Sequence, residues 1–237
     1  MLEIVEIIRP AEQGRNKAFI CRGEDETLYF VKGKNAGRRR QSCEWVAGKL
    51  ADRFGLPIPA SQLVLIPSDL LIDASEEFKE IGDGVAFASH SISHAQWFEK
   101  SFVPNVPISE QSDILIFDWW VQNDDRLVDN PNLLWDSAEG KVHIIDHDSA
   151  FSPDFFPTVF RNYHIFNECF NNVFNDLVSQ AEYSSRLIEA LSIFDDACSE
   201  LPADWLDHNS NNPNLFDPTA TRMVLERCLT QEIWNLE

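Results

Sequence analysis

The sequence predicts an α+β fold of two lobes, a β-rich first lobe (1–89) with one main helix and a mostly helical second lobe (90–237). The opening third consists of short runs rich in β-branched and aromatic residues, separated by polar turns, which is typical of strands. Further along, apolar residues recur mainly at the three- and four-residue steps of helices. No flexible linker separates the two parts, so we expect one domain with a cleft between the lobes.

Three short strands are expected first, at 3–8, 17–22 and 27–32. The turn between the first two contains Pro10 and Gly14, residues that favour turns.

The main helix of the first lobe is expected at about 37–54, where apolar residues recur at helical steps before Gly55 stops the run. The stretch 56–73 then predicts two more strands, paired with each other and with prolines at their ends. Another short strand is expected at 82–89.

The second lobe is expected to begin with a helix at 108–122, for which Ser109 is placed as the N-cap. Two strands near 132–135 and 142–145 follow. The remainder predicts helical runs and one polar loop, at about 163–182, 184–198 and 218–235 for the helices and at 209–214 for the loop.

The chain has 237 residues, 44% of them hydrophobic, which is enough for a sizeable core. Its net charge of −20 is unevenly distributed: residues 1–53 carry eleven Lys/Arg against eight acids, and the remainder carries eight against thirty-one. A body this acidic repels nucleic-acid phosphates, so we expect no direct binding of DNA or RNA. The basic segment can attract a small anion, and the acidic remainder a divalent cation or a basic partner.

The five cysteines are odd in number, widely spaced and without a C-x-x-C pair, which argues against a disulfide framework or a thiolate zinc site. No run of 18 apolar residues is present, so we expect no membrane span. The opening MLEIVEIIRP lacks the basic start and apolar core of a signal peptide. Together these features predict a cytoplasmic protein.

The stretch NDDRLVDNPNLL (123–134) is the most specific feature of the chain. Asp125 is followed five residues later by Asn130, the interval at which protein kinases place a carboxylate for the acceptor hydroxyl and an amide for Mg²⁺. The two strands expected at 132–135 and 142–145 form a hairpin, and Asp146 directly follows the second strand. Because hairpins bring their ends together, we expect Asp146 beside the same metal ion.

With its surroundings, this stretch resembles the HipA-like kinases, distant relatives of the phosphatidylinositol 3/4-kinase and protein-kinase superfamily. NDDRLVDNPNLLWD and HIIDHDSAF carry the resemblance at the catalytic segment. GRNKAFICRGEDETLYFVKGK resembles the opening hairpin and lysine strand, and SCEWVAGKLADRFGLPIPASQLVLI the helix and GLPxP turn after it. The resemblance covers most of residues 5–155 and implies a two-lobed protein-kinase-like fold that holds Mg·ATP between a β-rich N-lobe and a helical C-lobe.

By position, the resemblance implies that Asp125 is the catalytic carboxylate, that Asn130 and Asp146 bind magnesium, and that Lys32 reaches the ATP phosphates. Lys32 has independent support, because it ends an apolar strand in the one basic segment. Glu44, in the helix after the basic run, is a candidate partner for Lys32, although a solvated helix face explains it nearly as well.

Other nucleotide contacts are expected from a turn and a strand. The turn 10–17 has only Gly14 and no G-x-G-x-x-G, so side chains would have to contact the phosphates there. Three candidates stand in it: Gln13, Arg15 and Asn16. In the strand at the lobe junction, Phe87 and Ala88 are candidates to contact adenine, although a core position suits Phe87 better.

Two departures from the kinase pattern concern the phosphate acceptor more than the nucleotide. The metal-binding segment reads DHDSAF, so His147 and Asp148 replace the aromatic residue and glycine of a DFG motif. Leu127 also stands where the lipid kinases carry His.

Histidine patterns suggest competing sites. The His147-Asp148 pair, with His143 and Asp146 nearby, resembles the ligands of HD phosphohydrolases, but those enzymes place their ligands on helices and this stretch looks like a strand. His90 and His94 stand at an i, i+4 interval that suits zinc on a helix, but no Glu completes an H-E-x-x-H pattern. The run Arg38, Arg39 and Arg40 suits phosphate or an acidic partner, and a solvated helix N-terminus explains it equally well. Trp119 and Trp120 are expected in the core.

We expect phosphoryl transfer from ATP to a hydroxyl, with ATP and Mg²⁺ as cofactors, and by resemblance a protein Ser/Thr as acceptor, which includes the enzyme itself. The expected partners are a nucleotide and a protein substrate or antitoxin-like protein. Two alternatives stay open: a kinase-shaped module that binds nucleotide or a basic partner without turnover, and a metal-dependent phosphohydrolase.

Overall fold

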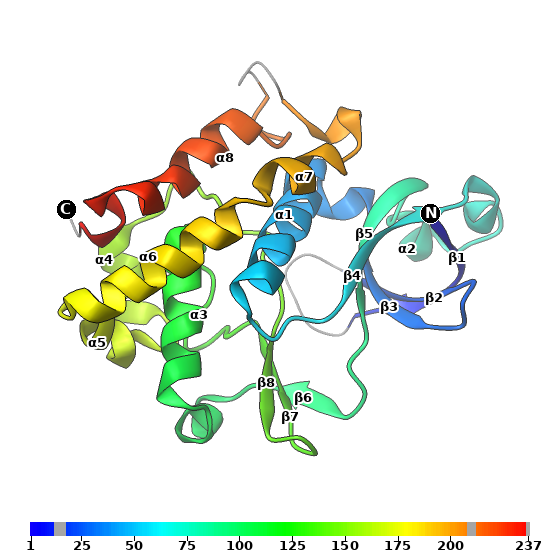
Figure 1. The fold of residues 1–237 in the computed structure, drawn as a ribbon. Helices are drawn as coiled ribbons and strands as arrows, with labels where there is room; N and C mark the ends of the chain where they lie inside the picture. Colours follow the sequence, from blue (N-terminus) through cyan, green and yellow to red (C-terminus); the bar gives the residue numbers. More distant parts are fainter. Residues whose placement is uncertain (12–17, 208–211, 236–237) are drawn as a thin grey trace.

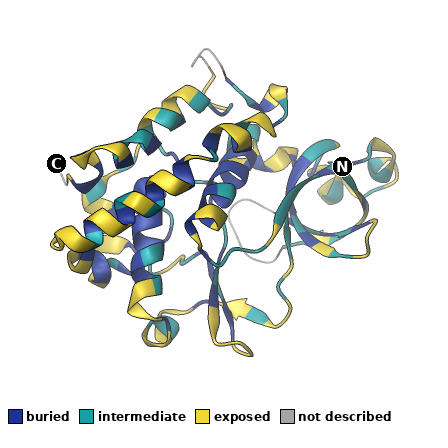
Figure 2. Ribbon diagram, in the orientation of Figure 1, coloured by how far each residue is buried: buried dark blue, intermediate teal, exposed yellow. Residues whose placement is uncertain are grey.

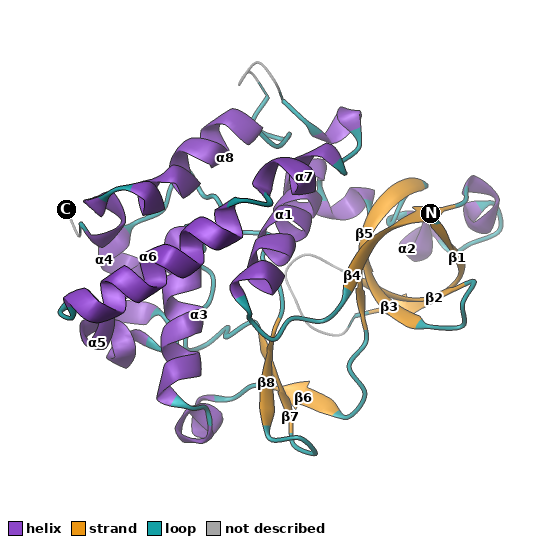
Figure 3. Cartoon of the chain, viewed as in Figure 1, coloured by secondary structure: helices purple, strands orange, loops and turns teal. Residues whose placement is uncertain are grey.

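A closed five-stranded barrel occupies one side of the molecule (Figures 1 and 3). The computed structural model describes residues 1–11, 18–207 and 212–235. The barrel strands follow the order β1-β2-β3-β5-β4, with β1 and β4 parallel and the other neighbours antiparallel. Their bounds are β1 Leu2–Pro10, β2 Phe19–Gly23, β3 Leu28–Lys32, β4 Ser61–Ile66 and β5 Gly84–His90. The three opening strands and the strand at 82–89 are therefore confirmed, while their closure into a barrel was not predicted.

The pleat of the strands separates the barrel interior from the side that faces the rest of the molecule. In the ladder of β3 with β5, Val31 pairs with Ala88, and both belong to the core inside the barrel. The next pair, Lys32 with Phe87, points the other way, because successive side chains alternate across a strand. Lys32 and Phe87 both line the cavity described below.

One prediction for the barrel region was wrong. The stretch 56–73 contains a single strand, β4, instead of a pair of strands. After Pro67 the chain forms a 3₁₀ turn, Ser68–Leu71, whose Leu70 and Leu71 pack against the barrel core. The short apolar run after Pro67 is compatible with either a strand or a turn that packs on the core, and its packing against the barrel favours the turn. A short helix, α2 (Glu76–Lys79), follows.

Helix α1 (Arg38–Phe54) confirms the helix predicted at 37–54, and it lies between the barrel and the other helices. It packs against β4 and β5 on one side and against α6 and α7 on the other. This position buries most of its surface, which appears dark in Figure 2. Gly55 ends the helix with φ of 95°, a left-handed conformation that glycine adopts without steric cost.

Helix α3 (Ile108–Trp120) lies among the other helices, and the loop that contains Asp125 follows its C-terminus. Trp119 and Trp120 are buried core residues, as expected, and each indole N–H donates to a backbone carbonyl near the C-terminus of the chain. The predicted N-cap was wrong: Pro107 occupies that position, and Ser109 is the second helical residue.

A three-stranded sheet, β6-β7-β8, packs beside the helices. Strands β7 (Leu133–Asp136) and β8 (Lys141–Ile144) form the predicted hairpin. Strand β6 (Ala95–Trp97) pairs with β7 and was not predicted, because three residues give no clear alternation.

The C-terminal part is helical, but the predicted bounds were wrong. Its helices are α4 Pro157–Tyr163, α5 Phe170–Phe174, α6 Leu177–Leu191, α7 Phe194–Ser199 and α8 Pro218–Leu225. The run expected at 163–182 is broken at Asp176, whose carboxylate accepts from Val178 and Ser179 N–H and starts α6. The loop expected at 209–214 lies partly outside the described residues. Among the described helices, none has the length and apolar character needed to cross a bilayer.

Candidate active site

A cavity of about 280 Å³ opens between the barrel and the β6–β8 sheet, and residues from both line it. Its apolar wall comes from barrel strands, the chain after α1 and the hairpin, including Phe30, Ile58, Phe87, Leu134 and Ile144. Its polar end comprises Lys32, Glu44, Asn130, Asn132 and Asp146. The cavity therefore offers an apolar region next to a charged one, the usual character of a small-molecule site.

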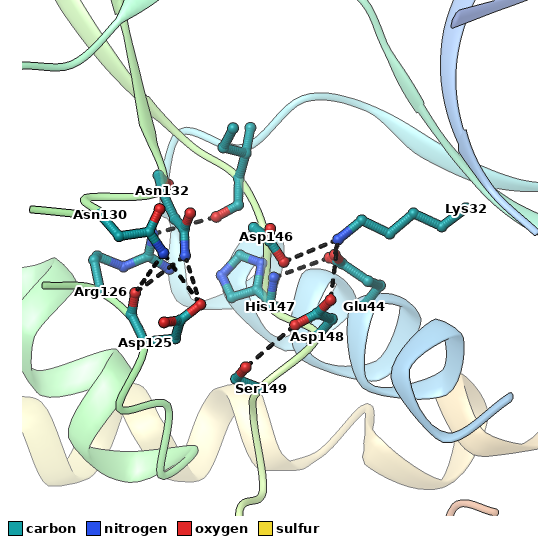
Figure 4. Close-up of polar contacts among 11 residues, drawn as sticks. Lys32, Glu44, Asp125, Arg126, Asn130, Asn132, Asp146, His147, Asp148 and Ser149 are labelled. Atoms are coloured by element: carbon teal, nitrogen blue, oxygen red, sulfur yellow. Dashed lines mark hydrogen bonds and ion pairs between the residues drawn. The ribbon is translucent and has the colours of Figure 1, made fainter. Parts of the chain in front are cut away.

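Lys32 joins the barrel to the charged end of this cavity (Figure 4). Its buried ammonium contacts the carboxylates of Glu44, Asp146 and Asp148, at 2.9 Å from Asp146 Oδ1 and 3.5 Å from Asp148 Oδ2. Burial by itself lowers the pKa of Lys32, but the three carboxylates outweigh burial and raise it, so the ammonium stays charged. The predicted pair of Lys32 with Glu44 is present.

Glu44 contacts the Asp146–Asp148 segment as well as Lys32. Its Oε2 accepts a hydrogen bond of 3.0 Å from the backbone N–H of His147, which fixes the segment between Asp146 and Asp148. Burial raises the pKa of Glu44 to about 7, although Lys32 acts in the opposite direction. For Asp146, burial is outweighed by Lys32, and the pKa is lowered.

The carboxylate oxygens of Glu44, Asp146 and Asp148 lie within 4.8 Å of one another. With Glu44 ionised, three carboxylates and one ammonium give this largely buried cluster a net charge of −2. Hard divalent cations such as Mg²⁺ take oxygen ligands, and a charge of +2 would balance the cluster. The donor set therefore fits the magnesium ion that the sequence predicts, with Asp148 as a further candidate ligand.

The backbone at Asp146 explains how Asp146 and Asp148 both reach the ammonium of Lys32. Strand β8 ends at Ile144, and Asp146 has φ of 61°, in the left-handed region. The segment is therefore not the extended strand that the β-branched sequence suggested. The turn directs both carboxylates toward Lys32, while the His147 ring packs on Phe117, with ring centroids 5.9 Å apart.

The loop between α3 and β7 (residues 121–132), which the sequence predicts to be catalytic and which we call the catalytic loop, places Asp125 among amides. Asp125 Oδ2 accepts from Asn130 Nδ2 at 3.2 Å and from Asn132 Nδ2 at 3.3 Å. Figure 4 shows these three side chains as one group, with Lys32 and its carboxylates as a second group beside it. Burial raises the pKa of Asp125, Asn132 opposes the rise, and the charge of Asp146 adds to it. The structure thus brings Asp125 and Asn130 together, next to the cluster that contains Asp146.

Arg126 ties the catalytic loop to the hairpin that carries Asp146, a role that the motif did not reveal. Its buried guanidinium donates through Nη1 to the carbonyl oxygens of Asn132 at 2.7 Å and Ile145 at 3.2 Å. Its Nε donates to Asp118 Oδ2 of helix α3 at 2.5 Å. One arginine therefore connects α3, the loop and the residue before Asp146.

Asp118 is the centre of this buried network. It also accepts from Asn123 Nδ2 at 2.9 Å and contacts His164 Nε2 at 3.0 Å. Because the Phe166 N–H donates to His164 Nδ1, the proton of the ring lies on Nε2 and points at Asp118. Burial raises the pKa of Asp118, but Arg126 and His164 outweigh it and hold the pKa well below its usual range. Burial lowers the pKa of His164, so its ring is neutral.

Of the other predicted nucleotide contacts, one side chain lines the cavity and one points away from it. Phe87 is buried and lines the cavity. The side chain of Ala88 points into the barrel core, which leaves only its backbone for a nucleotide. Gln13 and Arg15, with Asn16, lie outside the described residues.

The histidine patterns of an HD phosphohydrolase and of a helical zinc site do not have the expected secondary structure. His143 is on strand β8 and His147 and Asp148 follow it in a loop, not on the helices of an HD site. His90 ends β5 and His94 lies in a turn with φ of 66°, so the helical zinc spacing does not apply.

The arginine run at the start of α1 has structural contacts. Arg38 Nη1 donates to Val85 O at 3.0 Å, and Arg39 Nη2 donates to Phe151 O at 2.8 Å. These bonds attach the start of α1 to β5 and to the end of the DHDSAF segment.

Sequence reasoning missed Asn132, Arg126 and Asp118. Asn132 has φ of 49°, a conformation that Asn tolerates better than most residues, and the NPN sequence was a signal for it. Asp118 lies in an apolar helical run, and a buried acid at such a position needs a positively charged or hydrogen-bonding partner.

The family model of the HipA-like kinases matches residues 4–237. The chain belongs to the HipA-like kinase family. The resemblance noted over residues 5–155 is thus confirmed, and the match extends through the C-terminal helices. No curated protein matches this HipA-like chain. Among solved structures, the Helicobacter pylori proinflammatory kinase CtkA is similar, with a TM-score of 0.54 and 13% identity over 98% of this chain and 94% of that one. At that identity the likeness establishes a shared fold, with mixed helices and strands.

Proposed function

We propose that this HipA-like chain is an ATP- and Mg²⁺-dependent kinase that transfers the γ-phosphoryl group to a hydroxyl, with a protein Ser/Thr as acceptor. One observation carries the proposal: Lys32, Glu44 and Asp146 meet at the charged end of a cavity that Asn130 also lines, with Asp125 bonded to Asn130. These are the side-chain types and relations that phosphoryl transfer requires of a kinase.

In this proposal, residues 1–89 form a nucleotide-binding N-lobe and residues 90–237 a catalytic C-lobe of one kinase-like domain. The base and sugar would occupy the apolar part of the cavity, against Phe87 and Ile58. The phosphates would meet Lys32, whose ammonium Glu44 holds in place.

Asn130 and Asp146 would hold Mg²⁺, with Asp148 as an additional ligand. When bound, the ion would supply positive charge to the phosphate oxygens. Asp125 would orient the acceptor hydroxyl and take its proton as the oxygen bonds to the γ-phosphorus, while ADP leaves. A raised pKa suits this role, because it makes Asp125 a stronger proton acceptor.

A binding module without turnover is the second candidate. It is favoured by the engagement of Lys32 with three carboxylates, which compete with phosphate for the same ammonium. An antitoxin-like partner and a cytoplasmic location stay predictions from the sequence.

Asp125→Asn separates the two candidates. The change keeps the size of the side chain but removes its capacity to take a proton, so we expect phosphate transfer to fall by about 10²-fold or more while Mg·ATP affinity stays within about twofold. Phosphate transfer is measured by intact mass after incubation with Mg·ATP, with and without a Ser/Thr peptide mixture. Calorimetry measures the affinity for Mg·ATP. Mg·ATP binding without any phosphate adduct in the wild-type chain would support the binding module instead.

A further inference from the structure

Residues 151–165, here called the flanking segment, run beside the catalytic loop. At one end, the Phe151 N–H donates to Val121 O at 2.7 Å. At the other end, the Val128 N–H donates to Tyr163 O at 3.3 Å. Backbone hydrogen bonds at both ends hold the segment against the catalytic loop that contains Asp125. In the proposed function, the acceptor hydroxyl would reach Asp125 beside this segment.

The flanking segment exposes apolar side chains on one side of helix α4. Phe156 is 63% exposed, Val159 44% and Tyr163 59%. Val159 and Tyr163 stand four residues apart in α4 and so share a face of the helix, and Phe156 is the N-cap residue directly before it. We call these three exposed side chains the α4 face. Phe160, on the inner side, packs on Trp119 with ring centroids 5.6 Å apart, so the helix is anchored while the α4 face stays exposed.

Acidic groups adjoin this face. Asp129 is exposed in the catalytic loop and lines the cavity, and Asp154 is exposed two residues before Phe156. Asp124 is half-buried next to Asp125; burial raises its pKa, and the charges of Asp125 and Asp154 add to the rise. The one basic residue of α4, Arg161, is directed over the Phe170 ring at 5.1 Å, on the side of the helix away from the α4 face.

We propose that the α4 face and the adjoining Asp124, Asp129 and Asp154 dock the acceptor polypeptide, a segment with an apolar side chain and Lys or Arg close to the phosphorylated Ser or Thr. This inference rests on the proposed kinase function and names its substrate class. The apolar side chains offer contact area, and the acids attract a basic chain and select it over acidic ones.

The charge of the molecule decides among the possible occupants. A second copy would bring the same acids and a net charge of −20 against this surface, which is repulsive. Nucleic acid and anionic lipid are repelled for the same reason. A basic, partly apolar polypeptide is the occupant that complements both features.

The test uses the full chain with Mg·ATP and a library of peptides that carry one Ser or Thr, with Lys/Arg, Asp/Glu or apolar residues placed around it. We expect basic peptides with an apolar residue to react fastest. With the best peptide, Phe156→Ser and Tyr163→Ser should each raise the peptide KM by about tenfold and leave the KM for ATP unchanged. Asp154→Lys should reduce the preference for basic over acidic peptides by about tenfold.

Met223→Ser and Leu229→Ser are the matched controls, because these apolar side chains are 70% and 55% exposed and lie outside the flanking segment. They should leave the peptide KM unchanged. Melting temperatures of all variants show whether each one folds.

Four results would overturn the inference while leaving the kinase intact: a preference for acidic peptides, equal effects of the control changes, transfer only to non-peptide hydroxyls, or a wild-type dimer that Tyr163→Ser dissociates. A wild-type chain that neither binds nor hydrolyses Mg·ATP would overturn the proposed function, and the docking role with it.

Discussion

The ammonium of Lys32 lies among carboxylates from three parts of the chain: Glu44 of helix α1, and Asp146 and Asp148 of the segment after β8. Strand pattern and resemblance predicted Lys32, Glu44 and Asp146. Asp148 was predicted only as a ligand in a competing phosphohydrolase pattern, because its approach to Lys32 depends on the left-handed turn at Asp146. No local propensity signals such a turn at an aspartate inside a β-branched run.

Asp146→Ala tests the magnesium site at the scale of one residue. The change removes one of the carboxylates next to Lys32 and the ligand that the proposal requires, so the magnesium-dependent part of the ATP-induced rise in melting temperature should disappear. Thermal unfolding with ATP, with and without Mg²⁺, measures this part directly.

Glu139→Ala is the control, because this carboxylate is exposed on the turn between β7 and β8. It should keep the full magnesium-dependent rise. An undiminished rise in Asp146→Ala would exclude Asp146 as a ligand.

At the scale of elements, the buried network around Asp118 fixes α3, the catalytic loop and the β7–β8 hairpin in one arrangement. Asp118 and Arg126 are eight residues apart, and Arg126 reaches Ile145 across nineteen. The elements themselves were mostly predictable from their patterns. Their connection was not, because a buried ion pair between a helix and a loop has no periodic signature in the sequence.

Arg126→Met should lower the free energy of unfolding by about 3–5 kcal/mol, because it leaves the Asp118 carboxylate buried without its main positive partner. Arg126→Lys should also lose stability, since one ammonium cannot donate to Asp118 and to two carbonyls with the fixed fork of a guanidinium. Urea unfolding of the two variants measures both losses.

The double variant Arg126→Met, Asp118→Asn serves as the check on this reasoning. It removes both charges, so it should be less destabilised than Arg126→Met alone. If the double variant is destabilised by the sum of the two single changes, the pair is not the source of the loss.

For the whole molecule, buried neutral histidines set a pH dependence of stability. Burial lowers the pKa of His147 to about 3 and also lowers that of His164. The unfolded chain binds a proton on each ring below about pH 6.5, whereas the folded chain does not. The contribution of the two rings to the free energy of unfolding should therefore fall as the pH decreases from about 6.5, by about 1.4 kcal/mol per pH unit for each histidine, until the folded pKa is reached. Glu44, whose pKa burial raises to about 7, opposes part of this fall.

His147→Phe isolates one of these contributions. The His147 Nε2 is buried without a hydrogen-bond partner among the described residues, and the ring packs edge-on against Phe117, so phenylalanine should fit and stabilise the fold. Unfolding curves at about pH 7 and about pH 5 should differ less for His147→Phe than for the wild type, by about 1.4 kcal/mol per pH unit below 6.5. Equal pH dependence in both proteins would contradict a neutral buried His147.

The sequence by itself determined most of the strands and helices, the acidic character of the body, and Asp125, Asn130, Asp146 and Lys32 as candidate site residues, because local propensity, net charge and a short motif are properties of neighbouring residues. Only the tertiary structure decided that five strands close into a barrel, that Asp148 joins the cluster at Lys32, and that Arg126 couples the loop to the hairpin. These features depend on contacts between residues far apart in the chain, and such contacts are set by the packing of the whole molecule.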